Sequence, residues 1–128
     1  MHTKTAVITP YFREDEAIIR RCMRSVSLQT AAADHILVAD GHALDWIDRE
    51  NVRHLRLERA HADCGNTPRG LGALLAAAEN YRAICFLDAD NWYEADHVQA
   101  CLEASGQTGT GGECDLVIAR RVFRRNVL

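Results

Sequence analysis

The stretch Ile84-Cys85-Phe86-Leu87-Asp88-Ala89-Asp90-Asn91 decides how the rest of the chain is interpreted. Its uninterrupted apolar run predicts a strand that is buried on both faces of a parallel sheet. Asp88 and Asp90 then stand at the carboxyl end of this strand, where open α/β sheets place their ligand crevice. Two carboxylates this close repel each other unless a cation lies near them, and Mg²⁺ is commonly held by carboxylates together with substrate phosphates. The stretch therefore predicts a metal–phosphate site or, in the simpler interpretation, acids that cap the following helix.

The composition is that of a globular protein. The chain has 128 residues, of which 48% are hydrophobic and 26% are charged, and this balance excludes a disordered chain. The formal net charge of −3 gives no reason to expect nucleic-acid binding. A cluster of arginines within residues 120–125 is the one basic patch, and we interpret it as a solvated strand edge.

The cysteines indicate the cellular compartment. There are five of them, and no two form a CxxC pair, which argues for a reducing compartment and against a disulfide framework or a structural zinc site. No stretch has the length of a transmembrane helix, and the N-terminus lacks the apolar region of a signal peptide. The sequence therefore predicts a cytoplasmic protein without membrane insertion.

Apolar patterns along the chain predict strands that alternate with helices. The expected strands cover residues 5–9, 35–40, 52–57, 84–88 and 115–123. The expected helices cover 13–29, 67–78 and 94–104, and residues 43–50 form a short helix or an irregular loop. This order favours a mainly parallel sheet with right-handed crossovers. The dinucleotide pattern GxGxxG after the first strand and the P-loop pattern are both absent from the sequence.

Polar residues follow several of the expected strands, and the sheet rule places them on one rim. A nucleoside diphosphate suits this set, since Tyr11 can stack on a base, Asp40 can accept from a base N–H or a ribose hydroxyl, and Arg69 can reach a phosphate. Arg69 also lies in the first turn of a helix, whose N-terminus favours anions. Taken singly, each residue is more simply explained as an aromatic or a solvated charge at the rim without a ligand. The prediction of a site depends on their expected position together on one rim. The candidate residues are Thr9, Tyr11, Asp40, Arg69, Asp88 and Asp90.

Four segments in this order resemble the nucleotide-binding half of the family 2 glycosyltransferases, which have the GT-A fold. The segments are Val7-Ile8-Thr9-Pro10-Tyr11, the S-x-x-x-Q-T pattern of residues 25–30, Ile36-Leu37-Val38-Ala39-Asp40-Gly41, and the DxD of Asp88-Ala89-Asp90. The resemblance covers residues 5–123 and implies an α/β fold, namely a three-layer Rossmann-like GT-A nucleotide-binding domain with a mainly parallel sheet. It predicts a single nucleotide-sugar-binding domain over residues 1–128 that lacks the acceptor-binding half.

The resemblance also implies a nucleotide site. Thr9 and Tyr11 would line the base pocket, Asp40 would hydrogen-bond the base, commonly uracil, and Arg69 would lie near the nucleotide. A UDP-sugar is therefore the favoured partner. The chain departs from the family where the second strand ends, because Ala39-Asp40-Gly41-His42 stands in place of D-D-G-S and keeps only the second acid.

The two acids of the DxD would share the metal site in this resemblance. Asp88 would face the ribose or the water shell of the metal, and Asp90 would ligate the Mn²⁺ or Mg²⁺ that bridges the diphosphate. The metal would act as a Lewis acid and neutralise charge on the leaving nucleoside diphosphate.

The catalytic base is not assigned by the sequence. Full-length family members carry the acceptor site and the base carboxylate in a second half. Within this chain we considered Glu94 and Asp96, which look like first-turn helix acids, and also His97, Glu113 and Asp115.

Two functions therefore remain open. The first is a metal-dependent transferase that passes a sugar from a nucleotide sugar to an unknown acceptor. The second is a nucleotide-sugar-binding module without activity of its own, completed by a partner chain or by a homodimer. Phosphatases of the haloacid dehalogenase type also use DxD, but they need it after the first strand, whereas here it follows the fourth.

Overall fold

Four parallel strands form a sheet in the order β3-β2-β1-β4 in the computed structural model, which describes residues 4–106 and 114–120. Neighbouring strands pair in parallel throughout this sheet. The strands are β1 (Thr5–Tyr11), β2 (Asp34–Asp40), β3 (Arg53–Leu57) and β4 (Ala83–Phe86). The first four predicted strands are thus confirmed, and β3 lies at one edge of the sheet.

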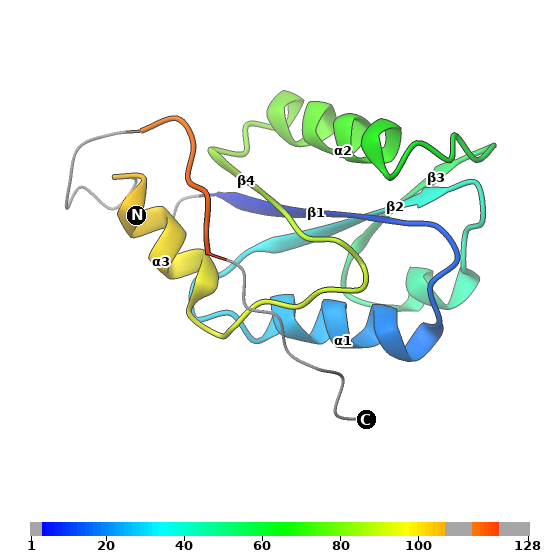
Figure 1. Cartoon of the computed structure of the whole chain (residues 1–128), viewed down its shortest axis with the longest axis horizontal. Helices are drawn as coiled ribbons and strands as arrows, with labels where there is room; N and C mark the ends of the chain where they lie inside the picture. Colours follow the sequence, from blue (N-terminus) through cyan, green and yellow to red (C-terminus); the bar gives the residue numbers. More distant parts are fainter. Residues whose placement is uncertain (1–3, 107–113, 121–128) are drawn as a thin grey trace.

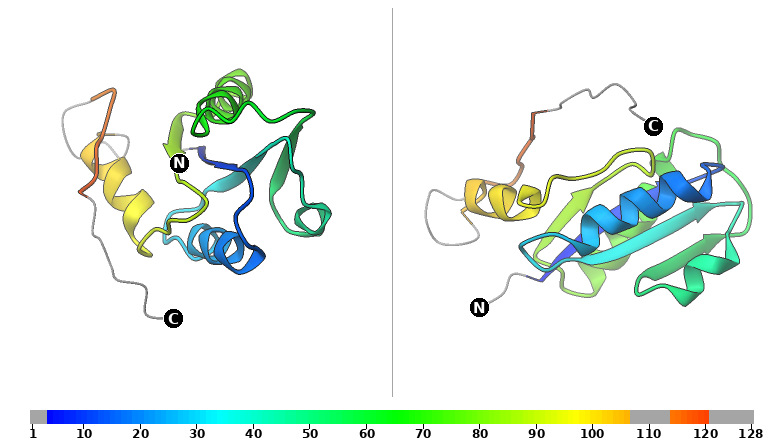
Figure 2. Two further views of the ribbon diagram at one scale, coloured as in Figure 1. Left: turned by 45° about the vertical axis from the view of Figure 1, so that its right-hand side comes forward. Right: turned by 90° about the horizontal axis from the view of Figure 1, so that it is seen from below.

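Helices cover both faces of the sheet and complete three layers (Figure 1). Helix α2 (Asn66–Ala78) lies on one face, and α1 (Glu16–Ser27) lies on the other, as the two further views also show (Figure 2). The 3₁₀ helix η1 (Asp45–Arg49) and helix α3 (His97–Ala104) contribute to the clusters on the α1 face. The predicted α/β fold with a parallel sheet and two helical layers is confirmed. In the described residues, no helix is long and apolar enough to cross a membrane.

Strand alternation explains how one central strand serves both layers. Every residue of β1 is buried. Val7 and Tyr11 belong to clusters with α1, whereas Ala6 and Ile8 belong to the cluster with α2, because successive side chains of a strand point to opposite faces. Helix α1 has an apolar stripe, in which Ile19, Cys22 and Val26 are all buried.

Strand β4 differs from the prediction. It pairs only with β1 among the described residues, so it is an edge strand, and Phe86 is 48% exposed rather than buried on both faces. The strand also ends at Phe86, before the two acids. The last predicted strand is wrong over its described part, since residues 114–120 form no regular element, and residues 121–123 lie outside the described residues.

Candidate functional site

Two of the predicted site residues form an ion pair at the rim. Arg69 Nη2 donates to Asp88 Oδ1 at 2.8 Å, although 19 residues separate them in the sequence. Arg69 comes from the first turn of α2, and Asp88 follows the end of β4. The Asp88 side chain is 51% exposed and that of Arg69 is 26% exposed. An ion pair this open contributes at most about 1 kcal/mol, so a charged ligand can exchange with either partner.

The loop before α2 fixes where Arg69 stands. Asp63 accepts a hydrogen bond from the Thr67 backbone N–H at 3.0 Å, and hydrogen bonds from Thr67 hold the pKa of Asp63 below its ordinary value. Gly65 precedes the helix with a φ of +81°, and its carbonyl accepts from the Arg69 N–H at 2.9 Å. The helix therefore begins at Asn66, one residue before the predicted start at residue 67. These bonds hold the first turn, and with it Arg69, at the rim.

Asp40 lies at the end of β2, and its carboxylate holds a loop in place. Oδ1 accepts from the His61 backbone N–H at 2.9 Å, and Oδ2 accepts from the Ala62 N–H at 3.1 Å. The Asp40 side chain is only 4% exposed. Each carboxylate oxygen has a second acceptor position. A ligand could therefore donate a second hydrogen bond to either oxygen, beside the bond from the loop.

Thr9 and Tyr11 are placed differently from what we expected. Thr9 is fully buried, and its hydroxyl is hydrogen-bonded to His35 Nε2 at 2.7 Å. Tyr11 is 2% exposed, and its hydroxyl contacts His54 Nε2 at 2.6 Å and accepts from the Leu44 N–H at 3.0 Å. Both side chains lie on the α1 face of the sheet, so the expected base pocket lined by Thr9 and Tyr11 does not fit this geometry.

An aromatic and basic cluster lies just beyond β1, and the sequence interpretation missed it. Phe12 meets His42 edge to face with 5.0 Å between ring centroids, and the Arg13 guanidinium lies 5.2 Å from the Phe12 ring centroid. Arg13 and His42 are also within hydrogen-bonding distance, at 3.3 Å. The signal was available, because Phe12 and Arg13 follow the first strand directly and His42 follows the glycine after the second.

Asp90 is the least engaged of the predicted residues. It is exposed, and within the described part of the chain its carboxylate has no hydrogen bond or ion pair. Its backbone carbonyl accepts from Arg21 Nη2 at 3.2 Å. No group of three His, Cys, Asp or Glu side chains in the described residues could hold a metal ion by itself. Asp88 and Asp90 nevertheless supply the hard oxygens that Mg²⁺ or Mn²⁺ takes together with phosphates, so the residues fit a metal that the nucleotide helps to bind.

The candidate bases remain without a role in the described residues. His97 stacks on Tyr93 with ring centroids 4.0 Å apart, and burial lowers its pKa. Glu94 and Asp96 are exposed on the segment before α3, and Asp115 is exposed as well. Glu113 lies outside the described residues. The geometry therefore assigns no base.

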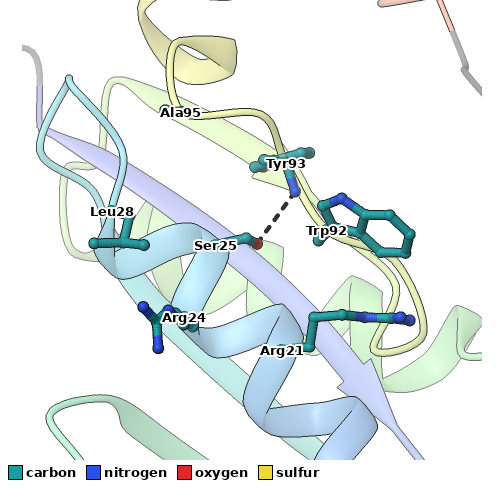
Figure 3. Close-up of a pocket in the computed structure, with 7 residues that line it drawn as sticks. All are labelled: Arg21, Arg24, Ser25, Leu28, Trp92, Tyr93 and Ala95. Atoms are coloured by element: carbon teal, nitrogen blue, oxygen red, sulfur yellow. Dashed lines mark hydrogen bonds between the residues drawn. The ribbon is translucent and has the colours of Figure 1, made fainter. Parts of the chain in front are cut away.

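A shallow hollow of about 260 Å³ lies beside α1 rather than at the rim (Figure 3). None of the predicted site residues lines it, so we build the candidate site from the charged groups of the rim. The lining residues are Arg21, Arg24, Ser25, Leu28, Trp92, Tyr93 and Ala95.

Comparison with known proteins gives a consistent result. Residues 6–126 match the family model described as glycosyl transferase family 2. The chain is 31% identical over 101 residues to the succinoglycan biosynthesis protein ExoW of Rhizobium meliloti (strain 1021). The match covers 74% of this chain and 32% of that protein.

Solved structures agree on the fold. The crystal structure of S. aureus TarS has a TM-score of 0.60 at 16% identity and covers 82% of this chain and 20% of that one. TarS 1–349 in complex with UDP has a TM-score of 0.59 at 18% identity, over 80% of this chain and 32% of that one. The chain thus spans about a third or less of the relatives it matches.

Proposed function

The chain belongs to glycosyl transferase family 2, and from this premise we propose that it binds a nucleotide sugar at the rim and takes part in transferring the sugar to an acceptor. The observation that carries the proposal is the 2.8 Å pair of Arg69 with Asp88, which stands two residues from the unengaged acid Asp90. A cation and two anions at the carboxyl ends of parallel strands suit a metal-bound diphosphate. UDP is the favoured nucleotide, in keeping with the neighbour solved in complex with UDP.

Each rim group has a part in this proposal. Arg69 contacts a phosphate through its guanidinium N–H groups, which suit phosphate oxygens. Asp90 and Asp88 hold Mn²⁺ or Mg²⁺, which when bound supplies Lewis-acid charge neutralisation of the leaving diphosphate. Asp40 contacts the base or ribose at the edge of the loop that it holds. Phe12 offers the half-buried aromatic surface at this rim in place of Tyr11.

A second candidate function is a binding module without its own turnover. It is favoured by the absence of an assigned base in the described residues. A further segment, a partner chain or a second copy would then supply the acceptor site. The free cysteines support a reducing, cytoplasmic setting for either function.

Calorimetry tests the shared part of both functions. We expect UDP to bind more tightly with Mn²⁺ than without it, and more tightly than GDP or ADP. Asp90→Ala should remove the metal enhancement, whereas the control Asp96→Ala, at an exposed acid of the same segment, should keep it. If none of the three nucleotides shows metal-enhanced binding, both functions fail. If binding is found, sugar transfer or slow nucleotide-sugar hydrolysis by this chain alone favours the transferase over the module.

A further inference from the structure

The acidic segment that follows β4 is hydrogen-bonded along its length to α1 and to the turn that follows α1. Cys22 Sγ donates to the Asp88 carbonyl at 3.8 Å, and Arg21 donates to the Asp90 carbonyl at 3.2 Å. Further along, the Thr30 N–H donates to the Ala95 carbonyl at 2.8 Å. These bonds all reach main-chain atoms of the segment. They therefore fix its path without engaging the carboxylates of Asp88 and Asp90.

Ser25 holds the middle of this segment. Its hydroxyl accepts from the Tyr93 backbone N–H at 3.1 Å and donates to the Cys22 carbonyl at 2.7 Å (Figure 3). The hydroxyl therefore uses its donor inside α1 and its acceptor on the segment. An alanine at this position would leave the half-buried Tyr93 N–H without this partner.

Gln29 clamps the segment at its far end. Its Nε2 donates to the Glu94 carbonyl at 2.7 Å and to the Ser25 carbonyl at 2.9 Å. Its Oε1 accepts from the Val98 N–H at 3.0 Å. Val98 lies in the first turn of α3, whose N-cap residue Asp96 makes no side-chain cap bond, so Gln29 caps α3 from the turn that follows α1.

The acidic pair needs this support because it lies beyond the sheet. The last bond to a neighbouring strand runs from the Leu87 N–H to the Ile8 carbonyl at 3.0 Å. Buried and exposed side chains alternate over residues 87–90. Leu87 and Ala89 are only 4% and 1% exposed, whereas Asp88 and Asp90 are exposed. The apolar side chains thus decide which way the acids face, and the bonds from α1 decide where their backbone stands.

We propose that Ser25 and Gln29 are positioning residues for the metal site formed by Asp88 and Asp90. They belong to the S-x-x-x-Q-T pattern, for which the sequence interpretation had no role. Their side chains hold the backbone on which the two carboxylates are mounted. The inference rests on the proposed function, because it assigns these residues to the affinity for the metal. Residues of α1 and of the turn after it touch no ligand in the proposed function, yet they would set the affinity for the metal.

Metal-dependent nucleotide binding tests the proposal. Loss of a group that orients a metal ligand typically lowers metal affinity about 10- to 100-fold. We expect Ser25→Ala and Gln29→Met to reduce the Mn²⁺ enhancement of UDP binding about tenfold or more, with metal-free UDP affinity unchanged. Ser25→Thr keeps the hydroxyl and should restore the enhancement. Ser27→Ala is the matched control, because Ser27 makes the same kind of bond within α1, to the Arg24 carbonyl, but faces solvent.

Any of the following results would overturn this inference in a protein that binds metal. Folded Ser25→Ala and Gln29→Met variants could keep the full metal enhancement, or Ser27→Ala could lose as much as they do. A loss of metal-free UDP affinity equal to the loss with metal would also overturn it, because it would mean general damage to the nucleotide site. Ser25→Thr failing to restore the enhancement would point to packing rather than to the hydroxyl.

Amide hydrogen exchange tests the positioning without any ligand. The Tyr93 amide should exchange about fivefold faster in Ser25→Ala, and the Val98 amide about fivefold faster in Gln29→Met, as expected for one lost hydrogen bond. Unchanged exchange at both amides refutes the positioning role whatever the metal does. If the unmodified chain shows no metal enhancement while the amides respond, the proposed function fails in its metal part, and so does the metal role assigned to Ser25 and Gln29.

Discussion

His35 should make the fold sensitive to mild acid. Its side chain is 5% exposed, its Nε2 is hydrogen-bonded to the Thr9 hydroxyl, and its Nδ1 has no hydrogen-bond partner in the described residues. Burial lowers the pKa of His35 to about 3, because the imidazolium would lose its hydration. In the unfolded chain the pKa of a histidine is about 6.5. Between these two values the unfolded chain binds a proton that the folded protein does not.

The sign and size of the effect follow from this difference. The stability that His35 contributes is fully present above the unfolded pKa and is lost as the pH falls through the window between about 6.5 and 3. At about pH 5 the unfolded state gains about 2 kcal/mol from protonation of this one side chain. A loss of this size is a large fraction of the total stability of a small domain, which is about 5–15 kcal/mol.

Urea unfolding at about pH 7 and pH 5 gives the free energy of unfolding at each pH, and the expected difference is about 2 kcal/mol. We expect His35→Gln, whose amide can still pair with Thr9, to lose about 2 kcal/mol less than the unmodified chain over this range. His42→Gln, at an exposed position, controls for the loss of one histidine. The lowered pKa of His97 affects the stability of both proteins equally, so it cancels from their difference. The lowered pKa of Asp63 changes the stability only in more acidic solution. Parallel pH dependences of His35→Gln and the unmodified chain would refute the reasoning.

Three glycine substitutions test the packing around the site, each by urea unfolding. Gly72→Ala should destabilise the protein by about 1–3 kcal/mol, because the new Cβ would lie 2.6 Å from Ile8 Cγ2. Gly70→Ala, two residues earlier in α2, should instead stabilise it by about 0.5–1 kcal/mol, because nothing lies within 4 Å of that position; equal effects of the two would contradict the packing argument. Gly41→Ala should destabilise the protein more than Gly72→Ala, because it combines a φ of +81° with a Cβ 2.2 Å from the Ala60 nitrogen. Wild-type exchange at the His61 and Ala62 amides in Gly41→Ala would show that the loop does not depend on this glycine.

The sequence predicts the layers and part of the rim for physical reasons. Apolar periodicity identifies strands and helices, and parallel strands must present their carboxyl ends to one edge. This is why Arg69 and Asp88, far apart in the sequence, were expected near each other and form an ion pair. The same reasoning placed Tyr11 at the rim but could not tell which face of β1 lies under α1 and η1, because β1 is apolar on both faces. Tyr11 is therefore buried where an exposed base platform was expected.

Backbone partners are the second limit of the sequence interpretation. Asp40 binds the N–H groups of two residues that follow it by 21 and 22 positions. Every residue except proline has such a group, so a carboxylate that binds a loop backbone leaves no pattern of residue types. Ser25 and Gln29 bind main-chain atoms in the same way. Their S-x-x-x-Q-T pattern was visible, but its partners were not.

The position of β4 explains why such a pattern is useful. A strand with two neighbours is held on both sides, whereas β4 pairs only with β1 in the described residues, and its pairing ends at Ile8 with Phe86. A segment that leaves an edge strand has many paths, and fixing it costs about 1–2 kcal/mol of conformational entropy per residue. Gln29 can oppose this cost because its amide carries both a donor for a carbonyl and an acceptor for an N–H. Helix α1, ordered by its buried stripe, and the turn that follows it can therefore place two carboxylates that no second strand supports.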